Sequence, residues 1–427
     1  MKKIIALLLA VVMVLSMGAM FSGCAADEPS VYYLNFKPEA DAAWQELAAL
    51  YTEQTGVKVT VVTAAGGEYE STLTAEMAKS EAPTLFQCGN QQALANWADY
   101  CLDLSDAAVT KEMTTDEYNI KDAEGKTRAI AYCYESYGII VNTALLEQAG
   151  HSLDEITNFE TLKAVAEDIH ARAEELGFDA FSPAGLDGTS SWRFSGHLAN
   201  LPMFYEFRDN NITEQPATVT GAYLENYKNI WDLYVNNSSA DPVNLSTSTS
   251  DESAAAFGTG KAVFYQNGSW EWASLTGKYG MNPADLAMIP IYCGVEGEEQ
   301  AGLCSGTENC WAVNAKASEA DQKATLDFLY WVVTSDEGTQ MMADELGAVS
   351  FKNAKVPTNG FCADAQEYAD AGCYNVSWAF NHTPNTEVWR SGVVSGLTAY
   401  SAGTGDWSAV ETAFVEGWAT QYAAQNG

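Results

Sequence analysis

The sequence predicts an α/β protein built from two lobes. Its 427 residues exceed the length of one typical compact domain. Hydrophobic residues make up 47% of the chain and aromatic residues 11%, which is enough to build large cores. Segments with strand character alternate with segments of helical periodicity. This alternation is typical of α/β lobes with parallel sheets.

The N-terminus has the residue order of a secretory signal. Lys2 and Lys3 precede an apolar run at 4–15, and small residues then lead to Ser22-Gly23-Cys24. The apolar run is too short for a dependable membrane span. The segment resembles a bacterial lipoprotein signal, in which the cysteine is lipidated and becomes the first mature residue. We therefore expect a signal peptide at 1–23, a lipid-anchored linker at 24–30 and attachment through Cys24 to the outer face of the bacterial membrane. An ordinary signal with an unmodified cysteine is the alternative.

Strands and helices alternate directly after this linker. Residues 31–36, 57–62 and 84–88 are apolar and β-prone. Between the first two strands, Trp44, Leu47, Ala48 and Tyr51 recur at helical spacing, and Gly56 supplies a C-terminal stop. A second helical stretch covers 69–79. These elements predict a first α/β lobe.

A second set of elements begins with a strand at 138–142. Helical periodicity follows at 162–176, 224–234, 321–333 and 408–422, and Gly177 ends the first of these helices. Trp331 and Trp418 lie at helical spacing among apolar neighbours, so we assign both to the core. The sequence contains no internal repeat and no second transmembrane segment.

Charge and cysteine content limit the partners. The formal net charge of −36 disfavours nucleic acid and anionic lipid, and it argues against a polyanionic ligand. Eight cysteines remain beside Cys24, an even number that permits disulfides outside the cytosol. Cys362–Cys373 and Cys304–Cys310 are possible local pairs, and buried free thiols are equally compatible. No Cys-x₂-Cys spacing occurs and the four histidines are scattered, so we expect neither a metal site nor a cofactor.

The most informative stretch covers 256–272. It contains the end of a helix, a tight turn at Gly258 and Gly260, a buried strand, and a second turn that presents Trp270 at the exit of the strand. An indole there offers a flat apolar face to the C–H face of a sugar, while its N–H is a donor. Taken alone, such a tryptophan more often belongs to a core or an interface.

The same stretch resembles the F-x-x-G-K-A-x-x-x-x-x-G-x-W signature of the family 1 extracellular solute-binding proteins, the group that includes maltose-binding protein. Four further segments resemble this family in the same order along the chain. They are 55–59, 137–142, 311–314 with 335–338, and 402–403 with 406–410. The resemblance covers essentially the whole mature chain.

The resemblance implies a periplasmic-binding-protein-like clamp with discontinuous lobes and a ligand cleft between them. We expect a first lobe at 31–138 and 311–345 and a second lobe at 139–310 and 346–427. The segments near 134–142, 304–314 and 345–352 would cross between the lobes as the hinge.

The resemblance also places residues in that cleft. Positions that match ligand-binding positions of the family are Glu39, Asn90, Gln91, Glu135, Trp192, Trp270 and Trp389. Trp378 and Trp311 are added because of their aromatic type and position. Each has a simpler interpretation: Glu39 as a partner of a helix dipole, Asn90 as a helix N-cap, and any tryptophan as core.

We therefore expect a monomeric protein that binds an oligosaccharide, such as a maltooligosaccharide, and delivers it to the permease subunits of an ABC importer, without enzymatic activity. A secreted glycoside hydrolase is one alternative, with Glu135 or Glu271 in an acid–base pair. A binding protein for another solute, such as a peptide, is a second alternative. No G-x-S-x-G, H-E-x-x-H or P-loop motif occurs. Only five arginines could clamp an anionic ligand.

Overall fold

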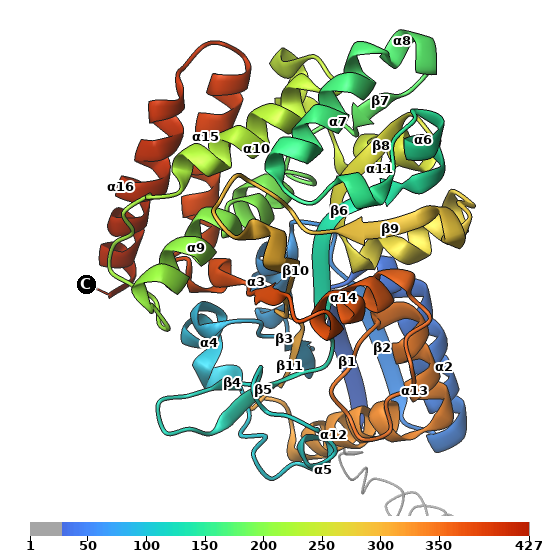
Figure 1. The fold of residues 1–427 in the computed structure, drawn as a ribbon. Coiled ribbons are helices and arrows are strands. Elements are labelled where there is room, and N and C mark those ends of the chain that lie inside the picture. Colours follow the sequence, from blue (N-terminus) through green and yellow to red (C-terminus); the bar gives the residue numbers. More distant parts are fainter. Residues whose placement is uncertain (1–27, 427) are drawn as a thin grey trace, which may run out of the picture.

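The computed structural model describes residues 28–426. The expected signal at 1–23, Cys24 and most of the expected linker lie outside these residues. Figure 1 shows two bodies, each built around one sheet, with strand β6 (Glu135–Asn142) running from their junction into the upper body. We call the body with the first sheet the first lobe and the other the second lobe. The predicted two-lobed α/β fold is confirmed.

The first sheet has the strand order β2-β1-β3-β11-β5-β4. Its strands are β1 (Ser30–Asn35), β2 (Lys58–Thr63), β3 (Leu85–Gln87), β4 (Ile120–Lys121), β5 (Thr127–Ala131) and β11 (Cys310–Val313). The helices of this lobe are α2 (Asp41–Thr55), α3 (Tyr69–Met77), α4 (Gln91–Trp97), α5 (Ala108–Lys111), α12 (Glu319–Thr334) and α13 (Asp336–Met341). Gly56 ends α2 with φ of 78°, as its position in the sequence predicts.

The second sheet has the order β12-β10-β6-β8-β7, and β9 pairs with β6. The remaining strands are β7 (Asp179–Phe181), β8 (Ala262–Gly268), β9 (Leu286–Ile289), β10 (Ala301–Gly306) and β12 (Tyr374–Val376). The helices are α6 (Thr143–Gln148), α7 (Phe159–Ala171), α8 (Ala173–Leu176), α9 (Asn200–Asn210), α10 (Leu224–Asn236), α11 (Ser250–Gly258), α14 (Gly360–Asp370), α15 (Thr386–Ser401) and α16 (Trp407–Asn426).

The prediction of parallel sheets is wrong for most strand pairs. In the first sheet only β1, β2 and β3 are parallel, whereas β11, β5 and β4 pair antiparallel. In the second sheet β6 is antiparallel to β8, β9 and β10. A short connection such as the one between β4 and β5 can join only antiparallel strands. The two sheets are therefore mixed.

Three segments meet where the chain passes between the lobes. Tyr132 N–H donates to the Asn309 carbonyl at 2.9 Å, and Tyr134 N–H donates to the Ala348 carbonyl at 2.8 Å. Thr307 Oγ1 donates to the Cys133 carbonyl at 2.5 Å. These bonds join residues 132–134, 307–309 and 348 into one crossing region, which lies within or beside the segments expected to cross.

Two of the lobe boundaries differ from the predicted ones. All of β6 belongs to the second sheet, so the first crossing comes before Glu135 and not at 138. Leu346 and Phe351 pack in the core of the first lobe, so the last crossing comes later than 345. The predicted boundaries followed the resemblance, whereas these contacts depend on packing between distant segments.

Within the described residues, all eight cysteines are free thiols. Trp418 is fully buried, and Trp331 packs against the core of the first lobe. No helix in the described part of the chain is long and apolar enough to cross a membrane.

Candidate ligand-binding site

Trp270 lies at the end of β8, in the short 3₁₀ turn η6 (Ser269–Glu271). A Cβ added at Gly268 would lie 2.2 Å from the indole, so only glycine lets this ring fold back over the strand end. The indole N–H donates to Asn267 Oδ1 at 2.8 Å. The predicted position at the strand exit is confirmed, but the N–H already has a protein partner. The ring itself is partly exposed.

Trp192 lies beside Trp270, with ring centroids 5.9 Å apart and an interplanar angle of 55°. Its N–H donates to the Thr189 carbonyl at 2.8 Å, and the side chain is partly exposed. His197 contacts both rings, at 5.0 Å from Trp192 and 5.3 Å from Trp270. The structure thus brings these two predicted tryptophans together, although 78 positions separate them in the sequence.

Three other predicted tryptophans are buried. Trp378 is 6% exposed and donates its N–H to the Cys304 carbonyl. Its ring lies 6.0 Å from the His197 ring, so it packs against the histidine that contacts Trp192 and Trp270. The predictions for Trp311 and Trp389 are wrong. Trp311 is 0% exposed and stacks on Tyr132 at 4.2 Å in the first lobe, because β11 is a central strand. Trp389 is 2% exposed, because it faces α16 and donates its N–H to Phe414.

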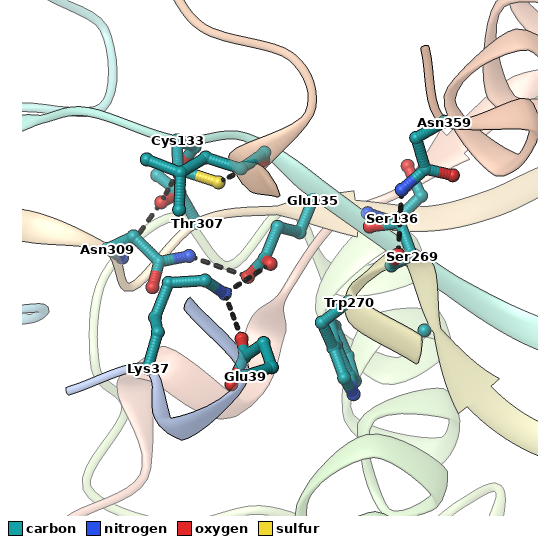
Figure 2. Close-up of polar contacts among 12 residues, drawn as sticks. Lys37, Glu39, Cys133, Glu135, Ser136, Ser269, Trp270, Thr307, Asn309 and Asn359 are labelled. Carbon is teal, nitrogen blue, oxygen red and sulfur yellow. Dashed lines mark hydrogen bonds and ion pairs between the residues drawn. The ribbon is translucent and has the colours of Figure 1, made fainter. Parts of the chain in front are cut away.

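A buried lysine joins two of the predicted carboxylates (Figure 2). Lys37 Nζ lies 2.6 Å from Glu135 Oε1 and 2.7 Å from Glu39 Oε1, and the lysine is only 3% exposed. Asn35 at the end of β1 fixes this turn, since its side chain bonds both the N–H and the carbonyl of Lys37. Burial alone would lower the pKa of Lys37. The charges of Glu135 and Glu39 more than offset burial, so the pKa is well above its usual value.

Glu135 and Glu39 differ in what they leave open to a ligand. Glu135 is 6% exposed, and Asn309 Nδ2 donates to its Oε2 at 2.6 Å, so both oxygens have protein partners. The Glu39 side chain is 28% exposed and is the more accessible acceptor. Lys37 and Asn309 were not predicted. Glu39 was selected because it matches a family position, whereas the place of Lys37 just after an apolar strand was the signal that could have found it.

Asn90 and Gln91 are less available to a ligand, because both side chains already bond to the protein. Asn90 Oδ1 accepts the Ala93 N–H at 2.8 Å, which makes it the N-cap of α4. Gln91 is exposed and donates to the Lys121 carbonyl at 3.2 Å. Gly89 nevertheless holds this loop against the crossing region, since a Cβ there would lie 2.1 Å from the Glu308 carbonyl oxygen. Asn90 is therefore near the crossing region, with its side-chain oxygen already engaged.

Two carboxyl groups near this region have raised pKa values. Burial raises the pKa of Glu271 to about 7, although the Arg193 guanidinium opposes this; the negative charge of Glu39 raises it further. Burial likewise raises the pKa of Glu308 to about 7, although the positive charge of Arg390 opposes this rise. Glu39 belongs to the first lobe and Glu271 to the second, where Asn267 Nδ2 donates to Glu271 Oε1 at 2.9 Å. Such groups accept hydrogen bonds when ionised and donate when protonated.

A sequence profile of the bacterial extracellular solute-binding proteins matches residues 46–370, which is most of the chain. The chain belongs to this family. Among curated protein sequences, none matches this solute-binding protein significantly.

Solved structures of sugar-binding proteins share the fold. The solute-binding protein RafE in complex with raffinose has 16% identity and a TM-score of 0.72, covering 92% of this chain and 99% of RafE. A chitin oligosaccharide binding protein has 15% identity and a TM-score of 0.70, with the same coverage. A Bacillus licheniformis sugar transporter protein in complex with stachyose has 16% identity and a TM-score of 0.67, covering 92% and 100%.

The two lobes of this solute-binding protein touch beside the aromatic pair. A Cβ at Gly67 of the first lobe would lie 2.7 Å from the Gly188 carbonyl oxygen of the second lobe. Gly188 is next to Thr189, which holds the Trp192 indole. Gly67 also has φ of 79°, a conformation that glycine tolerates best. The candidate site is thus bounded by the crossing region on one side and by the contact between Gly67 and Gly188 on another.

Proposed function

We propose that this protein binds an oligosaccharide between its lobes and delivers it to the permease subunits of an ABC importer. The observation that carries the proposal is the partly exposed pair Trp192 and Trp270, 5.9 Å apart, with Trp270 at the same junction as Glu39 (Figure 2). Indole faces suit the C–H faces of sugar rings, and carboxyl groups suit hydroxyls. An aromatic platform beside hydrogen-bonding groups is the recognition chemistry of a neutral polyol.

The ligands of the structural relatives support this ligand class. Raffinose, stachyose and chitin oligosaccharides appear with proteins of the same fold. These saccharides differ in sugar and linkage, so they support an oligosaccharide and leave its identity to experiment. Maltooligosaccharides therefore belong in the same set of test ligands.

Binding without turnover is part of the proposal. One observation favours the hydrolase alternative, because a carboxyl group such as Glu271 with a pKa of about 7 has the property of a general acid. Glu135, the other carboxylate considered for such a pair, is ion-paired with Lys37 and bonded by Asn309. Those partners suit a fixed structural carboxylate better than a catalytic one.

The proposal also covers attachment of the protein to the membrane and its oligomeric state. Lipidation of Cys24 would hold the protein at the outer face of the membrane, with its binding site facing the medium. Two acyl chains give durable anchoring, since each buried CH₂ contributes about 0.8 kcal/mol. We propose a monomer, because the site is formed by the two lobes of one chain.

A thermal-shift screen tests the ligand class. A ligand that binds only the folded state raises its stability, by about 2.7 kcal/mol at a hundred times Kd. Raffinose, stachyose, chitin oligosaccharides and maltooligosaccharides form the test set, and peptides form the comparison set. We expect at least one saccharide to raise Tm. A rise with peptides alone would favour the non-sugar alternative.

A further inference from the structure

The residue that precedes Trp270 is held by two segments of the chain (Figure 2). Asn359 Nδ2 donates to the Ser269 carbonyl at 2.7 Å, and the Ser136 N–H donates to Ser269 Oγ at 3.3 Å. The Ser269 carbonyl is part of the peptide plane that leads into Trp270. A hydrogen bond to this carbonyl therefore limits rotation of the plane and fixes the direction in which the indole leaves the backbone.

Asn359 makes this bond while it also caps a helix. Its Oδ1 accepts the Phe361 N–H at 2.9 Å at the start of α14, and the residue is 9% exposed. An amide carries both an acceptor and donors, so one side chain serves two elements. Aspartate would supply the cap but carries no donor for Ser269 when ionised. Serine would also supply the cap, but its hydroxyl ends one bond short of the amide nitrogen that reaches Ser269.

Asn359 lies where the chain leaves the first lobe for the last time. The N–H of the preceding residue, Thr358, still bonds the Ala343 carbonyl of the first lobe at 3.4 Å. Directly after Asn359, a Cβ at Gly360 would lie 2.5 Å from the Trp272 ring, and Phe361 contacts the same ring edge-on at 4.9 Å. Residues 359–361 thus contact both ends of the turn that carries Trp270.

We propose that Asn359 is a positioning residue for Trp270, which ties the ligand-facing indole to the last segment that crosses between the lobes. The inference rests on the proposed function, in which Trp270 contacts a saccharide. Asn359 itself does not face the ligand: it acts through the Ser269 carbonyl. Without the hydrogen bond from Asn359 the indole is no longer held in place, and affinity for the saccharide falls. Variants that preserve the cap keep α14 intact.

Two cap-preserving variants test the inference, with the best-binding saccharide of the thermal-shift set as the probe. Asn359→Ser is neutral and shortens the side chain, so that its hydroxyl no longer reaches the Ser269 carbonyl, and Asn359→Asp places a carboxylate against that carbonyl. We expect each to weaken binding by about threefold to tenfold, the loss expected when a buried carbonyl gives up its donor. Asn158→Ser is the matched control, because Asn158 caps α7 away from this turn and accepts the Thr161 N–H at 3.0 Å. It should bind as the wild type does.

A double-mutant cycle separates positioning from general destabilisation. In the Trp270→Ala background, Asn359→Ser should not reduce affinity further, because there is no indole left to position. An equal loss in both backgrounds would overturn the inference. If Trp270→Ala weakens binding but both Asn359 variants bind as the wild type does, the inference fails and the proposed function stands. If the wild type binds no saccharide, the proposed function fails, and the inference with it.

Discussion

Trp270 keeps a partly exposed indole at the junction of the lobes, whereas Trp389 is enclosed in the core of the second lobe. Truncating a fully buried tryptophan removes packing and leaves a cavity, which costs about 3 to 5 kcal/mol of stability. Truncating a partly exposed one costs less, because part of its surface already contacts water. The two tryptophans therefore allow ligand contact and core packing to be separated in one protein.

We predict that Trp270→Ala weakens saccharide binding at least about tenfold, or roughly 1.4 kcal/mol, with only a modest loss of stability. Calorimetric titration and thermal melts on the same variant measure both effects. Trp389→Ala is the control, and it should show the opposite pattern, with a large fall in Tm. Unchanged affinity of a folded Trp270→Ala variant would remove Trp270 from the site.

Glu271 makes stability depend on pH. Its pKa rises on folding from 4.5 to about 7, so ionising it costs more in the folded state. That cost is absent below about pH 4, grows between about pH 4.5 and 7, and is constant above this range. Glu271→Gln keeps an oxygen for the Asn267 Nδ2 donor and removes the charge.

We predict that Glu271→Gln raises Tm relative to the wild type at about pH 8 and has no effect at about pH 4. Melts across this range measure the difference. The exposed Glu53→Gln variant should show no such trend. A Tm difference that does not change with pH would contradict the proposed cause of the pKa shift.

At the scale of elements, the loop from β3 to α4 fits tightly against the crossing region. A Cβ at Gly89 would lie 2.1 Å from the backbone oxygen of Glu308, which cannot move away as a flexible side chain could. We predict that Gly89→Ala lowers stability by about 1 to 3 kcal/mol. Chemical denaturation measures this loss. Gly66→Ala, where a Cβ meets nothing within 4 Å, should leave stability nearly unchanged.

Local patterns predicted the elements near the site well. Helical spacing located α2, α7, α10 and α12, Gly56 ends α2 as predicted, and the turn at Gly268 placed Trp270 correctly at the exit of β8. Gly177 ends α8 and not α7, because the helix predicted at 162–176 is divided at Arg172. These features depend on residues close together in sequence. Helices α9, α14 and α15 were not predicted, although α15 carries Arg390, which donates to Ser195 Oγ at 3.3 Å.

The partners of the site residues could not be predicted in the same way. Lys37 and Glu135 are 98 positions apart, and Asn309 is 174 positions from Glu135. The periodicity of the sequence does not predict contacts between residues so far apart. The burial of Trp311 likewise depends on β11 inserting between β3 and β5, which are distant in sequence. Aromatic type and position in the sequence therefore suggested ligand contact for Trp311, a tryptophan that the sheet encloses.

At the scale of the whole molecule, the proposed lipid anchor at Cys24 would determine where the protein works. We predict that Cys24→Ala releases the protein from the membrane fraction, because the thiol that would be acylated is gone. Fractionation of cells followed by immunoblotting measures this. Cys362→Ala, which removes a free thiol in the second lobe, is the control and should stay with the membrane. Retention of the Cys24→Ala variant would contradict the lipoprotein interpretation.

Our central claim is that the two lobes enclose a saccharide and return it unchanged. Calorimetric titration with the saccharide set, followed by chromatography of the recovered ligand, tests both parts directly. We predict saturable binding of one saccharide per chain, with the ligand recovered intact after prolonged incubation. Absence of binding by every saccharide, or recovery of shorter sugars released by the protein, would contradict the claim.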